Sequence, residues 1–510
     1  MASGEGKQSC CWECPRRMLV CGSQRQACSR CIDVGTTCPG YTQVPPFRIR
    51  WLEPGRVDSR NRSREPKLKN KEDRKRKDKP PPSRNVNPSS SSAISLVPYF
   101  DLFDLAGEDL KASKAAVDFL HEVVWPKLAP MKELGIGDSI YRVSPNLFQA
   151  AVASPYYIRH GMTCMAIVHQ RNRVRHDPVQ EKALVATFLQ FRGKMIRSLS
   201  DDIGMEEKQT ADMMVLAGIF QLLFADISQG FSDGWRYHFN AAYKFILSRG
   251  NLRSMAEEPS TQILVHTFIY TAVVADSSSP PADQVLAPQD VRHLDMLIRL
   301  LDTTTARYTF NTYPAYLFAQ IMQINHLRAM ATKYGVPPQD LNEQACKILR
   351  GLHSFSVEQW VQQSKASCQE DYILLGHTYR SSVLLYCISS LKSVSVLSST
   401  SSLDSMASQE TQTLFNLLKQ SLKNPRIKMF MVWPLMVLGV EAVHGKIHEK
   451  RDFVRRWTEN MCTFTGSYSL FHLREVLEKF WASGKTVWDA CFDRPYLFTS
   501  VTNMNLAKMA

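Results

Sequence analysis

The sequence of 510 residues lacks an apolar run long enough to cross a membrane. Its longest run, from Met429 to Val440, has 12 residues and includes Pro434, whereas a spanning helix needs about 20. We also expect no secretory signal, because the N-terminus is polar and carries a cysteine cluster. These absences predict a chain without a membrane partner, in a reducing compartment where clustered thiols favour metal over disulfides.

The motifs of several enzyme classes are missing too. The sequence has no glycine-rich phosphate loop. His444 and His448 are four apart, as on one helical face, but a zinc-metalloprotease helix needs Glu after the first His, where Gly445 stands. His238 is better interpreted as a hydrogen-bonded structural residue than as a base. We therefore expect that the protein is not an enzyme.

Charge is distributed unevenly along the chain. Residues 1–90 hold 20 Lys and Arg against 9 Asp and Glu, whereas the other 420 residues hold 42 against 39. Most of the net charge of +14 therefore belongs to the N-terminal part. This distribution predicts a polyanionic partner for that part.

Composition divides the chain into three zones. Residues 1–41 are rich in cysteine, and residues 42–95 are rich in Pro, Ser and charge, as in a disordered basic linker. Residues 96–510 have helical apolar spacing, interrupted by a Ser-rich segment at Ser393–Ser408 that predicts a loop. We expect a large all-α domain here, as one irregular helical array or two packed sub-bundles. Helices are expected over Gln180–Ser198, Thr210–Ile227, Asp340–Val357, Tyr372–Leu391, Thr413–Leu422 and Leu470–Phe480.

Six cysteines near the N-terminus form one spacing unit written twice, C-x2-C-x6-C. They are Cys11, Cys14, Cys21, Cys28, Cys31 and Cys38. The x2 step lets two thiolates bind one metal from a single turn, and six sulfurs can complete two tetrahedral zinc ions if two of them bridge. The spacing predicts a small two-zinc module with two short helices, folded largely by its metal. A disulfide knot is the alternative, and Cys10 is interpreted as a spare thiol rather than a ligand.

On this spacing, residues 11–41 resemble the fungal Zn(II)2Cys6 binuclear-cluster DNA-binding domain. The resemblance implies that Cys11 and Cys28 bridge the two zinc ions. Cys14 and Cys21 would complete one site, and Cys31 and Cys38 the other. The segments CWEC at 11–14 and CPGY at 38–41, with residues 51–60, are similar to acriflavine-sensitivity-control-type regulators. Residues 235–238 and 433–435 look like parts of a fungal-specific transcription factor domain.

The resemblance also implies that the short helix after Cys14 reads a CGG triplet in the major groove of DNA. The expected contacts come from Arg16, Arg17, Met18, Arg25 and Arg30. Arg or Lys can bond to guanine O6 and N7 together. Met18 stands where the family usually has Lys or Arg, and because Met donates no hydrogen bond, it predicts weakened or altered reading.

A dense basic run in the linker includes Arg74, Lys75, Arg76 and Lys77 without interruption. We interpret this run as a nuclear import signal that also attracts the DNA backbone, with a merely solvated linker as the alternative. No sustained heptads occur between residues 60 and 130. The sequence therefore does not decide whether the chain forms a homodimer.

Together these features predict a nuclear, zinc-dependent regulator that binds double-stranded DNA and the transcription machinery. Its helical domain would be an effector or regulatory domain. The resemblance favours an activator of secondary-metabolite, drug-response or nutrient genes, and the residues do not choose among these gene sets. The first alternative is a nuclear co-regulator that acts through partner proteins because Met18 impairs DNA reading. The second is a cytosolic helical enzyme with a zinc appendage.

Overall fold

The computed structural model describes most of the second half of the chain and parts of the first. The described residues are 28–29, 31, 109–124, 154–204, 212–230, 234–286, 291–307, 314–364, 368–445 and 447–499. The chain divides into two units, Met1–Ser91 and Ser92–Ala510. All described helices with assigned bounds belong to the second unit.

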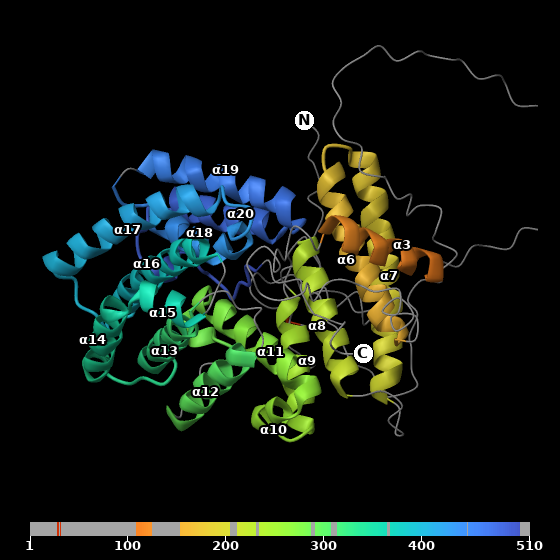
Figure 1. Cartoon of the computed structure of the whole chain (residues 1–510), viewed down its shortest axis with the longest axis horizontal. Helices are drawn as coiled ribbons and strands as arrows, with labels where there is room; N and C mark the ends of the chain where they lie inside the picture. The colour runs from red at the N-terminus through yellow and green to blue at the C-terminus, as the bar shows by residue number, and fades with distance from the viewer. Residues whose placement is uncertain are drawn as a thin grey trace, which may run out of the picture. The chain divides into compact units, whose positions relative to one another are not determined.

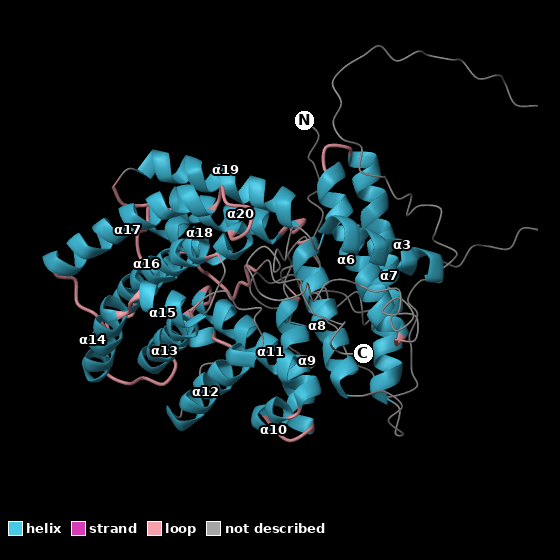
Figure 2. Cartoon of the chain, viewed as in Figure 1, coloured by secondary structure: helices cyan, strands magenta, loops and turns pink. Residues whose placement is uncertain are grey.

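The described part of the second unit is helical throughout, and Figure 2 shows no strand in it. Its first elements are α3 (Asp109–Phe119), η1 (Leu120–Val124), α6 (Tyr156–Val174), α7 (Pro178–Gly204), α8 (Asp212–Gln229), α9 (Trp235–Ser248), α10 (Leu252–Glu257), α11 (Pro259–Ser277), η2 (Pro281–Asp283) and α12 (Val291–Arg307). The later elements are α13 (Ala315–Thr332), α14 (Pro338–Ser354), α15 (Val357–Ser364), α16 (Gln369–Ser393), α17 (Ser401–Ser421), η3 (Lys428–Met431), α18 (Val432–Glu441), α19 (Ile447–Thr465), α20 (Ser469–Ala482) and η4 (Trp488–Ala490). The prediction of a large all-α domain is confirmed.

Helices α6 and α7 form an antiparallel pair, with α3 packed against α6 (Figure 1). The start of α7 follows from local sequence. The Asp177 side chain accepts the backbone N–H groups of Val179 and Gln180 at 3.0 and 3.1 Å, and Pro178 occupies the first helical position. An acidic cap followed by proline is a favourable helix start, because these groups replace the missing intrahelical bonds.

Helix α8 lies in the interior of the unit, as its apolar sequence predicts. It packs against α6, α7, α9 and α11, and nearly all of its side chains are buried. Among the described residues it is the helix that passes a membrane-span test by length and composition, yet 89% of the tested window is buried within the protein. Its apolar composition is therefore explained by the protein core.

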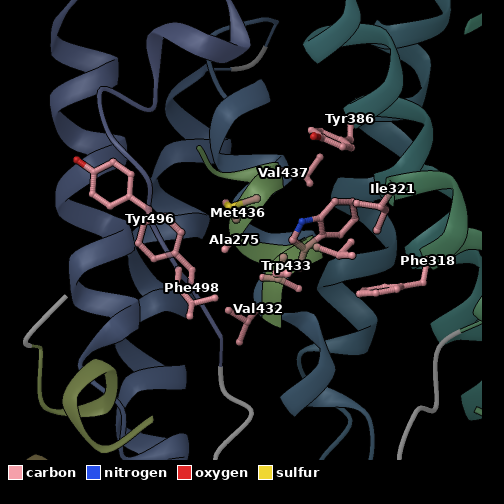
Figure 3. Close-up of a cluster of buried hydrophobic side chains, with 14 of the residues drawn as sticks. Ala275, Phe318, Ile321, Tyr386, Val432, Trp433, Met436, Val437, Tyr496 and Phe498 are labelled. Carbon is pink, nitrogen blue, oxygen red and sulfur yellow. The ribbon is translucent and has the colours of Figure 1, made fainter. Parts of the chain in front are cut away.

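One large apolar core runs through the unit, from Tyr157 on α6 to Phe498 after η4. Figure 3 shows part of it, where Trp433 of α18 lies among side chains of α13, α16 and the C-terminal segment. This continuity favours one irregular helical array over two separate sub-bundles. The helical unit has six cysteines of its own. Four of them, Cys164, Cys387, Cys462 and Cys491, are buried, and Cys346 and Cys368 are half-buried.

The prediction of a loop over Ser393–Ser408 is wrong for its second half. Helix α16 ends at Ser393, and α17 begins at Ser401, after Thr400 accepts the N–H of Leu403 at 3.3 Å. The serines of its first turns face solvent, whereas Leu403 and Met406 pack against the core. The high serine content led to the prediction of a loop, although the segment is the start of an amphipathic helix. The helix begins at Ser401 and not at Thr413, where the sequence predicted its start.

Candidate functional site

Two of the six predicted zinc ligands lie among the described residues. Cys28 and Cys31 are both buried, and the backbone N–H of Cys31 donates to the carbonyl oxygen of Cys28 at 2.9 Å. This bond closes a single turn, and side chains three residues apart on such a turn lie on the same side. The turn fits a pair of thiolates that bind one metal.

The remaining predicted residues of the N-terminal part lie outside the described residues. They are the ligands Cys11, Cys14, Cys21 and Cys38, the DNA contacts Arg16, Arg17, Met18, Arg25 and Arg30, and the import residues Arg74, Lys75, Arg76 and Lys77. Their roles stay predictions, as does the linker at 42–95.

The histidine pair considered for an enzyme does not share a helical face. His444 lies in the connection after α18, whereas His448 lies in the first turn of α19, and both are exposed. No cluster of three or more His, Cys, Asp or Glu side chains suited to a metal occurs in the described part of the chain. The two histidines are therefore surface residues in the described structure.

Among the charged residues that the structure describes, Arg328 on α13 has a fully buried side chain. Its guanidinium donates to the Tyr386 hydroxyl at 2.9 Å and to the Asp489 carboxylate at 2.5 Å. It also donates to the carbonyl oxygens of Asp276 and Ser279, each at 3.0 Å. Burial alone would lower the pKa of Arg328, but Tyr386 and Asp489 raise it above its ordinary value. The buried arginine is therefore charged and compensated.

Two tryptophans complete this cluster. Trp433 donates from Nε1 to the Ser277 hydroxyl at 3.0 Å, and Trp488 donates to the Ser277 carbonyl at 3.2 Å. Both indoles lie against the ring of Tyr386, with centroids 5.9 and 4.8 Å away. The Arg328 cluster thus joins α11, α13, α16, α18 and η4, which explains why residues 433–435 lie in the core. Its groups serve to fix the packing of these elements.

A second buried cluster joins α7, α8 and α9 around Asp226, whose side chain is 2% exposed. Arg192 donates to both carboxylate oxygens at 2.6 Å, and His238 Nε2 lies 3.0 Å from Oδ2. Burial would raise the pKa of Asp226, but the hydrogen bonds from Arg192 and His238 lower it below its ordinary value. His238 is a hydrogen-bonded structural residue, which confirms its interpretation from the sequence.

An open cleft lies where α3, α6 and α7 meet, and no sequence pattern predicted it. Its volume is about 500 Å³, and its lining mixes charges of both signs with two tyrosines. Lys194 is paired with Asp109 at 2.5 Å, and the Tyr157 hydroxyl donates to Asp202 at 2.8 Å. Residues from three helices meet here only after folding, so no local spacing could have revealed the cleft.

Comparisons with known proteins found a matching family and a relative of this chain. The model of the fungal specific transcription factor domain matches residues 144–493. The "Phomenoic acid biosynthesis cluster-specific transcriptional regulator" of Leptosphaeria maculans is 32% identical over 508 residues. The aligned region covers 98% of this chain and 91% of that protein. No solved structure matches the chain.

Proposed function

The chain belongs to the family of proteins with a fungal-specific transcription factor domain, and we propose that it is a zinc-dependent, sequence-specific DNA-binding regulator. It would act on RNA polymerase II genes from the nucleus and read CGG-type triplets. The observation that carries the proposal is the duplicated cysteine spacing in a chain that is a transcription regulator by family.

Support for the DNA-binding module comes from three sources. Six cysteines have the spacing for two zinc ions, and the described turn at Cys28 and Cys31 fits a shared metal. The first 90 residues hold most of the net positive charge. Similarity to the curated regulator covers nearly the whole chain, so it is not limited to the helical domain.

In this proposal zinc supplies the bonds that fold the module and that position its short helices. Arg16 and Arg17 donate to guanine edges, while Arg25 and Arg30 add further contacts to DNA. The run from Arg74 to Lys77 serves nuclear import and attracts phosphates. Deleting residues 67–79 should shift a fluorescent fusion to the cytoplasm, and a fusion that stays nuclear would count against the import role.

The printed name of the Leptosphaeria maculans relative suggests which genes this chain regulates. Because that protein is named as a biosynthesis cluster-specific regulator, we propose that this chain activates the genes of a biosynthetic cluster. The helical domain would be its regulatory part. The test is the expression of neighbouring biosynthetic genes after deletion and after overexpression of the regulator, with unchanged expression in both cases as the contradicting result.

The DNA-binding proposal is tested by selecting random duplex DNA with the zinc-loaded full-length protein. We expect enrichment of CGG-containing sites and two zinc ions per chain. A Cys14→Ala variant should lose the enrichment. Zinc binding without enriched sequences would instead favour the co-regulator alternative, in which Met18 impairs direct reading.

A further inference from the structure

The cleft between α3, α6 and α7 shares no residue with the two buried clusters described above. Its volume of about 500 Å³ lies in the range of small-molecule sites. Its lining includes two positively charged residues, Lys194 and Arg197, and three negatively charged ones. The negatively charged residues are Asp109, Asp201 and Asp202. A ligand for this cleft must therefore satisfy both signs of charge.

The start of α6 provides the first half of an anion site. The helix follows Pro155, which gives no side-chain cap, and the N–H groups of Tyr156 and Tyr157 have no hydrogen-bond acceptor in the described part of the chain. Free N–H groups and the helix dipole at such an end attract a carboxylate. Arg197 lines the same cleft, is exposed, and forms no ion pair with another described residue.

A buried histidine gives a second and independent indication of a ligand. His160 lines the cleft and is only 4% exposed, yet its Nδ1 atom has no hydrogen-bond partner among the described groups. Burial lowers the pKa of His160, and the nearby cations Lys194, Arg159 and Arg197 lower it further against the opposing effect of Asp109. The ring is neutral near pH 7. A buried polar atom normally has a partner, so a bound molecule would supply the missing one.

A negative charge, Asp201, lies one helical turn after Arg197 on α7. Asp201 is exposed and, like Arg197, has no ion-pair partner in the described structure. The two residues are four apart on α7, a spacing at which a salt bridge is favourable, but they do not pair with each other. Both charges are therefore available to one ligand.

We propose that this cleft binds a small zwitterion, one of the standard α-amino acids. Its carboxylate lies at the start of α6 beside Arg197, its ammonium group lies at Asp201, and His160 Nδ1 provides a third polar contact. A simple organic acid would face three carboxylates in the same cleft, and a simple amine would face Arg197 and the helix dipole. A zwitterion is attracted at both ends.

The experiment titrates the full-length protein with each of the standard L-α-amino acids, using calorimetry and thermal unfolding. We expect at least one to bind and to raise the melting temperature. For the tightest binder, the carboxamide and the N-acetyl derivative remove one charge each. Each derivative should bind about tenfold more weakly or worse, because it loses a charged hydrogen bond.

Variants on the exposed face of α7 locate the site without disturbing the core. Arg197→Gln and Asp201→Asn should each weaken binding about tenfold or more. Arg350→Gln, an exposed arginine on α14, is the matched control and should bind as the native protein does. Absence of binding by all amino acids, equal binding by the N-acetyl derivative, or unchanged binding by both α7 variants would overturn the proposal. Because the titration uses no DNA, such a failure would leave the proposed DNA-binding function standing.

Discussion

The cysteine repeat and the helical domain bring their polar side chains together in different ways. Cys28 and Cys31 are three residues apart and meet on one turn, so spacing along the chain is enough to predict their proximity. Arg328 and Asp489 are separated by 161 residues and meet only because α13 and η4 pack into the same core. In the proposed function, metal ligands would hold the first region together, whereas apolar burial and long-range hydrogen bonds hold the second.

The largest effect is expected from Cys28→Ala, because a bridging sulfur would be lost from both proposed zinc sites. Structural zinc contributes about 10–16 kcal/mol in small zinc domains. DNA binding should therefore be abolished, while the thermal unfolding of the helical domain stays unchanged. Cys10→Ala is the matched control, since Cys10 lies outside the repeat, and gel-shift titration with calorimetry measures both properties. Full DNA affinity in the Cys28 variant would contradict the proposed ligand set.

The converse change is Arg328→Ala in the helical domain. Breaking this buried pair removes the cationic partner of Asp489, which typically costs about 3–5 kcal/mol. The free energy of unfolding of the helical domain, measured by denaturant titration, should fall by this amount, and zinc content should stay at the native level. The exposed Arg350→Ala serves as control. A loss no larger than that of the control would show that the Arg328 cluster does not stabilise the fold.

A smaller effect comes from Glu441, a buried carboxyl at the end of α18 that accepts from Ser389 at 2.5 Å. Burial raises its pKa to about 7, although Ser389, Lys450 and Lys392 oppose the rise. The folded state then holds the proton that the unfolded state releases above its ordinary pKa of 4.5. The stabilising contribution present below pH 4.5 is therefore lost as the pH rises through 7.

Replacing this group by Glu441→Gln should remove the pH dependence and make the domain more stable than the native one at pH 8, by on the order of 2 kcal/mol. Exposed Glu449→Gln on α19 is the control. Denaturant titrations at pH 5 and pH 8 measure the difference. Parallel pH profiles of the native protein and the Glu441 variant would refute this assignment.

The substitution Met18→Lys changes the N-terminal region and should strengthen its binding to DNA. A lysine can donate to guanine where methionine cannot, and a good base contact contributes about 1–3 kcal/mol of discrimination. Affinity for CGG-containing DNA, measured by fluorescence anisotropy, should rise without any change in the melting of the helical domain. Unchanged affinity would remove Met18 as the reason for weak reading.

The smallest effect is expected from Thr400→Ala, which removes the cap of α17. Loss of such a cap costs about 0.5–2 kcal/mol. Ser402→Ala, on the exposed face of the first turn, is the control. If thermal unfolding of the two variants coincides, Thr400 does not determine where α17 begins.

Periodicity along the sequence predicted the helical class and the positions of α7, α8, α14, α16 and α20, because apolar spacing is a local property. It failed at Ser393–Ser408, where a Ser-rich helix face was interpreted as a loop. The structural role of His238 was also predicted. The Arg328 cluster, the partners of Asp226 and the cleft were missed, because each unites residues from helices that are far apart in the chain. Such contacts depend on tertiary packing, which no local pattern encodes.

The central claim is that metal ligands and a helical core stabilise two independent regions of one transcription regulator. The most direct measurement treats the zinc-loaded full-length protein with a chelator while recording DNA binding and far-ultraviolet circular dichroism during thermal unfolding. We expect DNA binding to disappear and to return with added zinc, while the helical signal and its melting temperature stay constant. DNA binding that survives complete zinc removal, or a helical domain that melts with the loss of zinc, would contradict the claim.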